Sequence, residues 1–176
     1  YSTRSRGDDL TQRIKPHFKK WQLLVGVSDE LAAKQIHKDG IHILIDLAGH
    51  TANNRLGIFA WRPAPVQISW LGYFASTGVT EIDYILGDPY VTPINEANHF
   101  TEKIWQLPKS YLCFSAPKVD VDVESLPALD SERITFSCFN KIARINDNVV
   151  ATWSRILIAI PNAVLFIKDK SLNDKL

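Results

Sequence analysis

The feature that most constrains the fold is an apolar run, residues 41–47, that passes directly into a small and polar segment, residues 48–54. The run is rich in β-branched residues and alternates only weakly with polar ones. Such a run is typical of a strand that is covered on both faces of a parallel sheet. We therefore expect a buried parallel strand at 41–47.

A second strand with a similar ending follows this one. Residues 56–61 have a short helical pattern, which is expected to stop there because two prolines follow and cannot continue a helix. The next strand is expected at 66–71 and breaks at a glycine. Ligands of open α/β sheets bind beyond the carboxyl ends of the strands. The tips Gly49–Thr51 and Leu71–Tyr73 are therefore expected to line one cleft.

A series of short motifs extends along nearly the whole chain. They are DLAGHT (46–51), NRL (54–56), RPAPVQ (62–67), WLGY (70–73), DY (83–84), DP (88–89), LPKSYLCF (107–114) and FSCFNKIARI (136–145). These motifs resemble the catalytic region of O-linked N-acetylglucosamine transferases, a family that includes bacterial and plant SPINDLY-like proteins and usually carries TPR repeats. The pair RPAPVQ and WLGY is long and unusual enough to be the strongest evidence for this resemblance.

The remaining pattern predicts further elements of an α/β fold. Helices are expected at 8–20, with Leu10, Ile14 and Phe18 on an apolar face, and at 28–38, with Leu31 and Ile36 on a core face and Gly40 as the stop. Strands are expected at 83–87, 103–107, 133–139 and 163–168, and a brief turn or helix is expected from Pro93. A further helix is expected to start at the N-cap Asn146. Its apolar stripe consists of residues 149, 150, 153, 156, 157 and 160.

The resemblance implies a partial GT-B glycosyltransferase with parts of two Rossmann-like, doubly wound domains. Residues 1–117 would be the C-terminal part of the first catalytic domain. The acidic, proline-punctuated stretch 118–132 would be a linker or surface excursion. Residues 133–176 would form the first β-α-β unit of the second, nucleotide-binding domain.

Composition excludes several classes of protein. The net charge of +1 gives no global electrostatic argument for binding nucleic acid or a membrane, and no apolar run approaches the roughly 20 residues of a membrane helix. Cys113 and Cys138 fit a reduced, cytoplasmic protein and are expected as buried structural thiols. Because methionine is absent, even at the first position, we expect a fragment or a processed piece.

The first candidate site is the pair of strand tips. From the residues alone, His50 is either a cleft residue that hydrogen-bonds a ligand or a histidine that holds a tight loop. The resemblance implies that His50, Thr51, Leu71 and Gly72 bind the donor. Gly49, Arg55 and Tyr73 would support the cleft, and Arg55 could instead face an anionic substrate. The family pattern after Tyr73 has one more glycine than the Phe74–Gly78 sequence found here.

The second candidate site is the turn after the strand at 133–139. A strand-loop-helix junction presents free N–H groups that suit phosphate. Lys141 and Arg144 add two cations there, and a guanidinium can grip phosphate through two hydrogen bonds. The resemblance implies that Arg144 contacts the leaving diphosphate, and Lys141 is expected to bind the donor beside it, with Asn140 in support. The family has a lysine at the position of Arg144.

The resemblance implies transfer of N-acetylglucosamine from UDP-GlcNAc to serine or threonine of a protein acceptor. No cofactor or metal is expected, because no His, Asp and Glu residues have ligand spacing. No catalytic base is assigned, because the G-N-H-P-type motif that holds the family's essential histidine is absent. Two alternatives stay open: another donor (GDP-fucose or UDP-glucose) or an asparagine acceptor, and a non-catalytic or degenerate fragment. A dehydrogenase is disfavoured, because no G-x-G-x-x-G motif follows a strand.

Overall fold

The structure is a computed structural model that describes residues 1–5, 7–116 and 121–173. The chain divides into two compact units, Tyr1–Ala116 and Pro117–Leu176. The elements of the first unit are α1 (Asp9–Ile14), η1 (Lys15–His17), α2 (Asp29–Lys38), β1 (Ile43–Asp46), α3 (Leu56–Ala60), β2 (Val66–Trp70), β3 (Tyr84–Gly87), η2 (Ile94–His99) and β4 (Lys103–Gln106).

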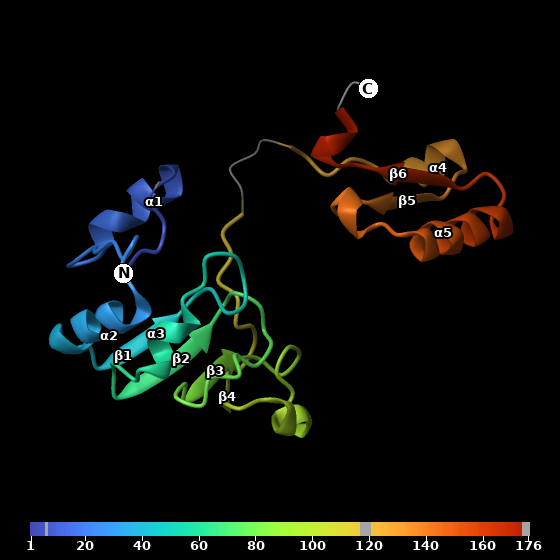
Figure 1. Ribbon diagram of the computed structural model, residues 1–176. Coiled ribbons are helices and arrows are strands. Elements are labelled where there is room, and N and C mark those ends of the chain that lie inside the picture. Colours follow the sequence, from blue (N-terminus) through green and yellow to red (C-terminus); the bar gives the residue numbers. More distant parts are fainter. Residues whose placement is uncertain (6, 117–120, 174–176) are drawn as a thin grey trace. The chain divides into compact units, whose positions relative to one another are not determined.

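Strands β1 to β4 form one parallel sheet in chain order. Figure 1 shows these strands side by side, with α2 and α3 next to β1 and β2. The predicted strands and the α/β class are therefore confirmed. Because all four strands run in one direction, their carboxyl ends share one edge of the sheet, where ligands of α/β proteins bind.

The core of this unit lies between the sheet and helices α2 and α3. Helix α2 starts where Ser28 accepts a hydrogen bond from the Leu31 N–H and stops before Gly40, which has a φ of +67°. Its buried residues join β1 and α3 in one apolar cluster. The cluster consists of Leu24, Ala32, Ala33, Ile36, Leu44, Leu56, Ile58, Phe59, Ala64 and Ile82.

Two core predictions for this region are wrong. Strand β1 is buried on one face only, since Leu44 and Asp46 are buried whereas Ile43 and Ile45 are 56% and 45% exposed. The core cluster covers the Leu44 face alone. On α2, Leu31 is exposed, because Ala32 and Ala33 are the residues one turn before Ile36 on the buried side.

The helix predicted at 8–20 is also shorter than expected. It ends at Ile14, and a single turn of 3-10 helix follows over Lys15–His17. Pro16 has no N–H to continue the helical hydrogen bonds, and its ring clashes with the preceding turn. Leu10, Ile14 and Phe18 are therefore exposed rather than part of a core face.

The second unit is a single β-α-β element. It contains α4 (Pro127–Ser131), β5 (Thr135–Cys138), η3 (Ile142–Arg144), α5 (Asp147–Ala159), β6 (Val164–Ile167) and η4 (Lys170–Asn173). Strands β5 and β6 are parallel, and Asn146 caps α5 by accepting from the Val149 N–H at 3.0 Å. The predicted β-α-β unit is thus confirmed.

Three details of this unit and its approach differ from expectation. The predicted linker starts among residues 117–120, which lie outside the described residues. The later part of the linker contains the helix α4, which has a proline in its first turn and ends at Glu132 in a left-handed conformation. On the α5 stripe, Val150 and Ile156 are exposed. Cys113 is exposed and Cys138, at the end of β5, is only half-buried, so neither is the buried thiol that was expected.

No helix within the described residues is both long and apolar enough to cross a membrane.

Candidate functional site

The tip of β1 is a turn that a buried carboxylate holds. Asp46, the last residue of the strand, accepts hydrogen bonds from the N–H groups of Ala48 at 3.1 Å and Gly49 at 2.8 Å. Its Oδ2 also accepts from the Ser69 hydroxyl of β2 at 3.3 Å. The carboxylate therefore ties the first tip to the neighbouring strand, and Gly49 takes the left-handed φ of +51° that this turn requires.

The tip of β2 lies directly against this turn. Gly72 has a φ of +55°, and a Cβ on it would be 2.5 Å from both the carbonyl carbon and the oxygen of Ala48. A Cβ on Gly49 would in turn be 3.4 Å from the backbone N and O of Tyr73. The two glycine-bearing tips thus touch through their backbones, which only glycine at position 72 permits. The structure brings Gly49, His50, Leu71, Gly72 and Tyr73 into one small region.

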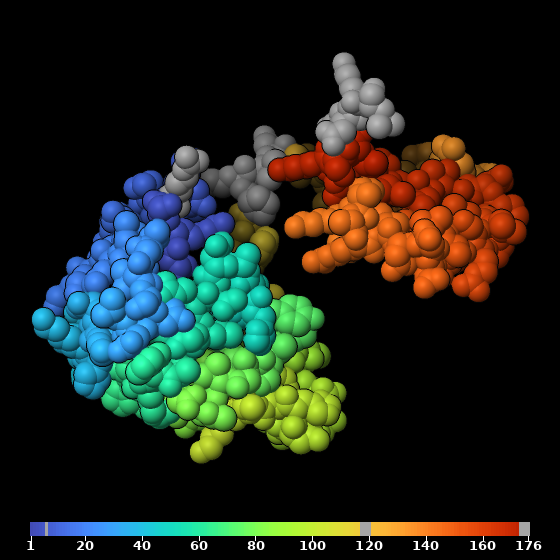
Figure 2. All heavy atoms as spheres, in the orientation of Figure 1, coloured from blue at the N-terminus to red at the C-terminus, as the bar shows by residue number. Residues whose placement is uncertain are grey.

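His50 stands at this junction with its side chain exposed. Its Nε2 lies 2.9 Å from the carbonyl oxygen of Ser76. The neighbouring Thr51 is also exposed, and its hydroxyl donates to Ala48 O at 2.7 Å. In the space-filling view, the teal and green segments that follow β1 and β2 form part of the surface of this unit (Figure 2). His50 therefore holds the loop after Gly72 and is open to a ligand at the same time.

The aromatic residues after Gly72 form a small exposed platform. The rings of Tyr73 and Phe74 stack with their centroids 4.8 Å apart. Both side chains are exposed. Exposed aromatic faces can pack against the apolar side of a sugar ring or against another planar group.

The guanidinium of Arg55 binds the segment before α2 and the first residue of that helix. Its Nε donates to the Asp29 carboxylate at 2.6 Å, and its Nη2 donates to Val27 O at 2.7 Å. The Nη1 group donates to Leu24 O at 3.2 Å. These contacts fix the loop before α2, so the arginine acts as a structural support for the region.

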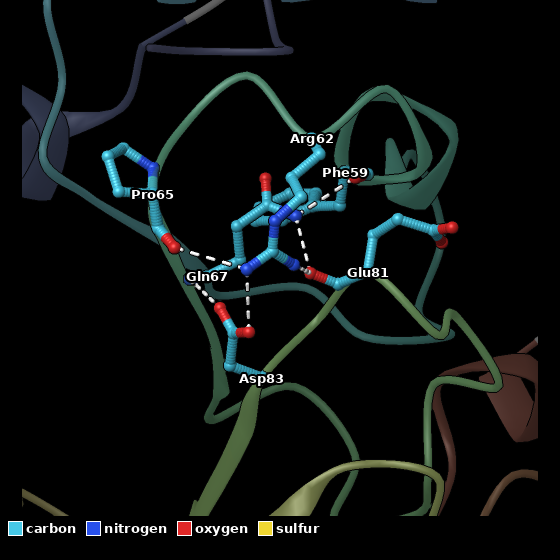
Figure 3. Close-up of polar contacts among 6 residues, drawn as sticks. All are labelled: Phe59, Arg62, Pro65, Gln67, Glu81 and Asp83. Carbon is cyan, nitrogen blue, oxygen red and sulfur yellow. Dashed lines mark hydrogen bonds and ion pairs between the residues drawn. The ribbon is translucent and has the colours of Figure 1, made fainter.

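Arg62 and Asp83 connect the loop before β2 to the start of β3 (Figure 3). The guanidinium donates to Asp83 Oδ1 at 2.8 Å, to Glu81 O at 2.8 Å and to Pro65 O at 3.2 Å. Asp83 Oδ2 accepts from the Gln67 N–H at 2.8 Å. Burial opposes ionisation of Asp83, but the hydrogen bonds from Arg62 and Gln67 outweigh it and lower the pKa of the carboxyl. The RPAPVQ motif is thus a structural clamp.

In the second unit, the turn after β5 carries the two predicted cations. Asn140 Oδ1 accepts from the Lys141 N–H at 3.0 Å and from Arg144 Nη1 at 3.5 Å. The side chains of Asn140, Lys141 and Arg144 are exposed. Asp169 follows the neighbouring strand. Hydrogen bonds from Ser171, and to a lesser extent the Ile142 N–H and the Lys141 charge, lower the pKa of its carboxyl. An incoming anion would meet two cations with one carboxylate beside them.

Among the described residues, no group of three or more His, Cys, Asp and Glu side chains could hold a metal ion.

Comparison with known proteins identifies the family. The model of glycosyl transferase family 41 matches residues 17–119, which is more than half of the chain. The chain belongs to glycosyl transferase family 41.

Relatives extend this family 41 match over both units. A probable UDP-N-acetylglucosamine–peptide N-acetylglucosaminyltransferase SPINDLY from Eustoma exaltatum subsp. russellianum is 38% identical over 174 residues, 97% of this chain and 19% of that protein. A UDP-N-acetylglucosamine–peptide N-acetylglucosaminyltransferase from Caenorhabditis elegans is 49% identical over 80 residues, 46% of this chain and 7% of that protein. The chain thus spans about a fifth of the length of the SPINDLY relative.

A solved structure supports the same family 41 fold. An O-GlcNAc transferase mutant from Thermobaculum terrenum matches with a TM-score of 0.84 and 33% identity, over 99% of this chain and 33% of that chain. This match confirms the predicted partial glycosyltransferase fold of α/β class.

Sequence reasoning missed three polar residues that organise this family 41 site: Asp46, Ser76 and Glu102. Asp46 could have been found, because an aspartate that ends a strand two or three residues before a glycine is a common turn former. Ser76 and Glu102 carry no such local signal. Their roles come from contacts between distant segments, since the Ser76 carbonyl meets His50 and the Glu102 carboxylate accepts from the Thr77 N–H at 2.7 Å.

Proposed function

We propose that this protein is an inverting glycosyltransferase that moves N-acetylglucosamine from UDP-GlcNAc to serine or threonine hydroxyls of proteins. The observation that carries the proposal is the contact between the two strand tips at Gly72 and Ala48, with His50 and Thr51 exposed beside it. The names of the relatives that align with 97% of the chain support the same donor and a peptide acceptor.

Each tip residue has a role in this proposal that its surroundings support. The missing side chain of Gly72 makes room for the Ala48 backbone, and this contact sets the course of the Leu71–Gly72 backbone that would face the sugar nucleotide. His50 and Thr51 offer hydrogen-bonding atoms to the polar groups of the donor sugar. Asp46 and the neighbouring loop hold these residues in place before the donor arrives, which avoids the cost of ordering them on binding.

The turn of the second unit supplies the charge for the leaving group in this proposal. Lys141 and Arg144 would stabilise the negative charge that develops on the diphosphate as the glycosidic bond breaks. Asn140 accepts from Lys141 N–H and from the Arg144 side chain and so helps to set the turn. Asp169 lies close enough to lower the net positive charge there and would favour release of the product.

Radiolabelled donors test this function directly. Full-length protein is incubated with labelled UDP-GlcNAc, UDP-glucose or GDP-fucose and a peptide acceptor rich in serine and threonine. Label transferred from UDP-GlcNAc and removed by β-elimination supports the proposal. Transfer from GDP-fucose alone contradicts the proposed donor, and label that resists β-elimination contradicts a serine or threonine acceptor.

By the same resemblance, we propose that the protein carries TPR repeats and acts in the cytoplasm. Cell fractionation with an antibody against the protein, together with the sequence that flanks this chain, would check both.

A further inference from the structure

A buried carboxylate that the proposed function does not use lies beneath the loop after Gly72. Glu102, just before β4, is only 4% exposed. Its Oε1 accepts from the Thr77 N–H at 2.7 Å and from the Thr77 hydroxyl, and its Oε2 accepts from the Ser76 hydroxyl at 2.9 Å. Hydrogen bonds to a charged acceptor are stronger than neutral ones, and a low-exposure site strengthens them further. Glu102 therefore fixes residues 76 and 77 firmly to the sheet.

Ser76 is the centre of this network. Its Oγ accepts from the Thr101 N–H at 3.1 Å and from the Gly78 N–H at 3.3 Å, and the Thr101 hydroxyl lies 3.0 Å away. Its only hydroxyl proton goes to Glu102, because a carboxylate oxygen can only accept. With two N–H groups accepted and one proton donated, the hydroxyl of Ser76 is saturated. The Ser76 side chain is thus bound to Thr101 and Glu102, just before β4, as well as to its own loop.

The carbonyl of Ser76 connects this hydrogen-bond network to His50. A carbonyl oxygen can only accept, so His50 Nε2, 2.9 Å away, must carry the proton and donate it. In the neutral ring, Nδ1 is then the atom that accepts. Within the described part of the chain, no protein group donates to that nitrogen.

We propose that Glu102 is a positioning residue for the bound sugar nucleotide. It holds the Ser76 carbonyl where it orients the His50 ring, and His50 Nδ1 is thereby offered as an acceptor for a hydroxyl or amide N–H of the ligand. This inference rests on the proposed function for the identity of its ligand. The chain of contacts from Glu102 through Ser76 to His50 is present in the protein without a ligand.

The substitution Glu102→Gln tests the proposal with almost no change in volume. If the amide nitrogen of glutamine faces Ser76, it meets a hydroxyl whose lone pairs already accept two N–H groups. If it faces Thr77, two N–H donors oppose each other. The first orientation breaks the link to Ser76, whereas the second breaks the link to Thr77 and leaves Ser76 with a neutral, weaker acceptor. Glu96→Gln, an exposed site in η2 of the same unit, is the matched control.

Hydrogen exchange of the ligand-free full-length protein gives the first readout. We expect Glu102→Gln to speed amide exchange at residues 76–78 and also at 48–54, by about tenfold, because the first tip loses the anchored partner of His50. Faster exchange at 76–78 with no change at 48–54 overturns the proposal, since Glu102 would then act only on its own loop. Glu96→Gln should leave both segments unchanged.

A double-mutant cycle gives the second readout, on kcat/KM for UDP-GlcNAc transfer. Glu102→Gln should lower kcat/KM about tenfold when His50 is present and less than about twofold in the His50→Ala background, because contacting residues are energetically coupled. An equal loss in both backgrounds overturns the proposal. If the unsubstituted protein shows no transfer from UDP-GlcNAc, the proposed function fails, and the exchange experiment alone decides the role of Glu102.

Discussion

Gly72 allows the closest backbone approach in the candidate site. Its φ of +55° is one that side-chain-bearing residues adopt at a cost, and the Ala48 carbonyl occupies the place of a Cβ. Leu71, with a φ of +63°, already bears such a cost next to it. Strain of this kind persists only where the surrounding structure enforces it, which agrees with a site built for a ligand.

The substitution Gly72→Ala should lower the free energy of unfolding by about 2–4 kcal/mol, since it combines a left-handed residue with overpacking. Urea denaturation followed by tryptophan fluorescence measures this. Gly26→Ala is the control, because Gly26 has a φ of +75° but a Cβ added to it would meet no atom within 4 Å. It should cost only about 1–2 kcal/mol. Equal losses for the two variants would contradict the tight contact between the tips.

Asp83 contributes to stability through its charge. A carboxyl whose pKa is lower in the folded than in the unfolded protein stabilises the fold above its unfolded pKa of about 4. That contribution is lost as the pH falls through the lower folded pKa. Because Arg62 is nearly half exposed, solvent screens the pair, and we expect Asp83→Asn to cost about 1–2 kcal/mol at pH 7.

The difference in unfolding free energy between Asp83→Asn and the unsubstituted protein should begin to shrink as the pH drops below about 4, where the unfolded carboxyl takes up its proton, and should be lost once the pH has passed the lower folded pKa. Urea denaturation at a series of pH values measures it. A difference that stays constant from neutral to acidic pH would show that the charge of Asp83 does not matter.

At the scale of the elements, helix α5 owes its start to one side chain. Asn146 accepts from the Val149 N–H and satisfies one of the free amides of the first turn. Asn146→Ala should destabilise the second unit by about 1 kcal/mol, whereas Asn146→Asp should be close to neutral, because aspartate caps equally well. Thermal unfolding followed by circular dichroism tests this. Equal melting temperatures for the two variants would contradict the cap.

The elements that the sequence predicted best are those with local signals. Ser28 and Gly40 frame α2, Asn146 starts α5, and a glycine follows β2, so each boundary lies close to its expected position. The exposed face of β1 was not predictable in this way. An apolar run such as Ile43–Ile45 indicates a strand that could be buried on both faces. Which face is actually covered depends on the tertiary packing of other elements, and here Ile43 and Ile45 stay exposed.

The same distinction applies to the candidate site. The glycine tips were predictable from the rule that strand ends of parallel sheets converge, and the structure places Gly49 against Tyr73. Glu102 was not, because it lies 25 residues beyond Thr77 and meets it only through the pairing of the sheet. Arg55 could be read either as a ligand contact or as a support, and its bonds to Leu24, Val27 and Asp29, which favour a support, join segments distant in sequence.

At the scale of the whole molecule, the proposed function divides the work between two units. The first unit provides two strand tips that hydrogen bonds within the protein hold in place, from the Gly49 N–H to Asp46 and between His50 and the Ser76 carbonyl. The second unit provides an exposed turn with two cations that few protein groups engage. Rigid backbone suits recognition of a sugar, and exposed cations suit a diphosphate, whose charge rises as the glycosidic bond breaks.

Arg144→Ala should therefore weaken the binding of UDP to the full-length protein by about 5- to 100-fold, as expected for loss of a charged hydrogen bond. Isothermal titration calorimetry measures this affinity. Arg144→Lys should retain most of it, because a lysine keeps the charge although it cannot grip the phosphate with two hydrogen bonds.

Arg155→Ala provides the control for charge alone. Arg155 lies on α5 and is exposed, and its guanidinium donates to Thr152 Oγ1 at 3.3 Å within the same helix. Its removal lowers the net charge of the second unit by the same amount as Arg144→Ala. If the two variants weaken UDP equally, the second unit attracts the nucleotide only through its overall charge. If only Arg144→Ala does so, the turn after β5 binds the diphosphate directly.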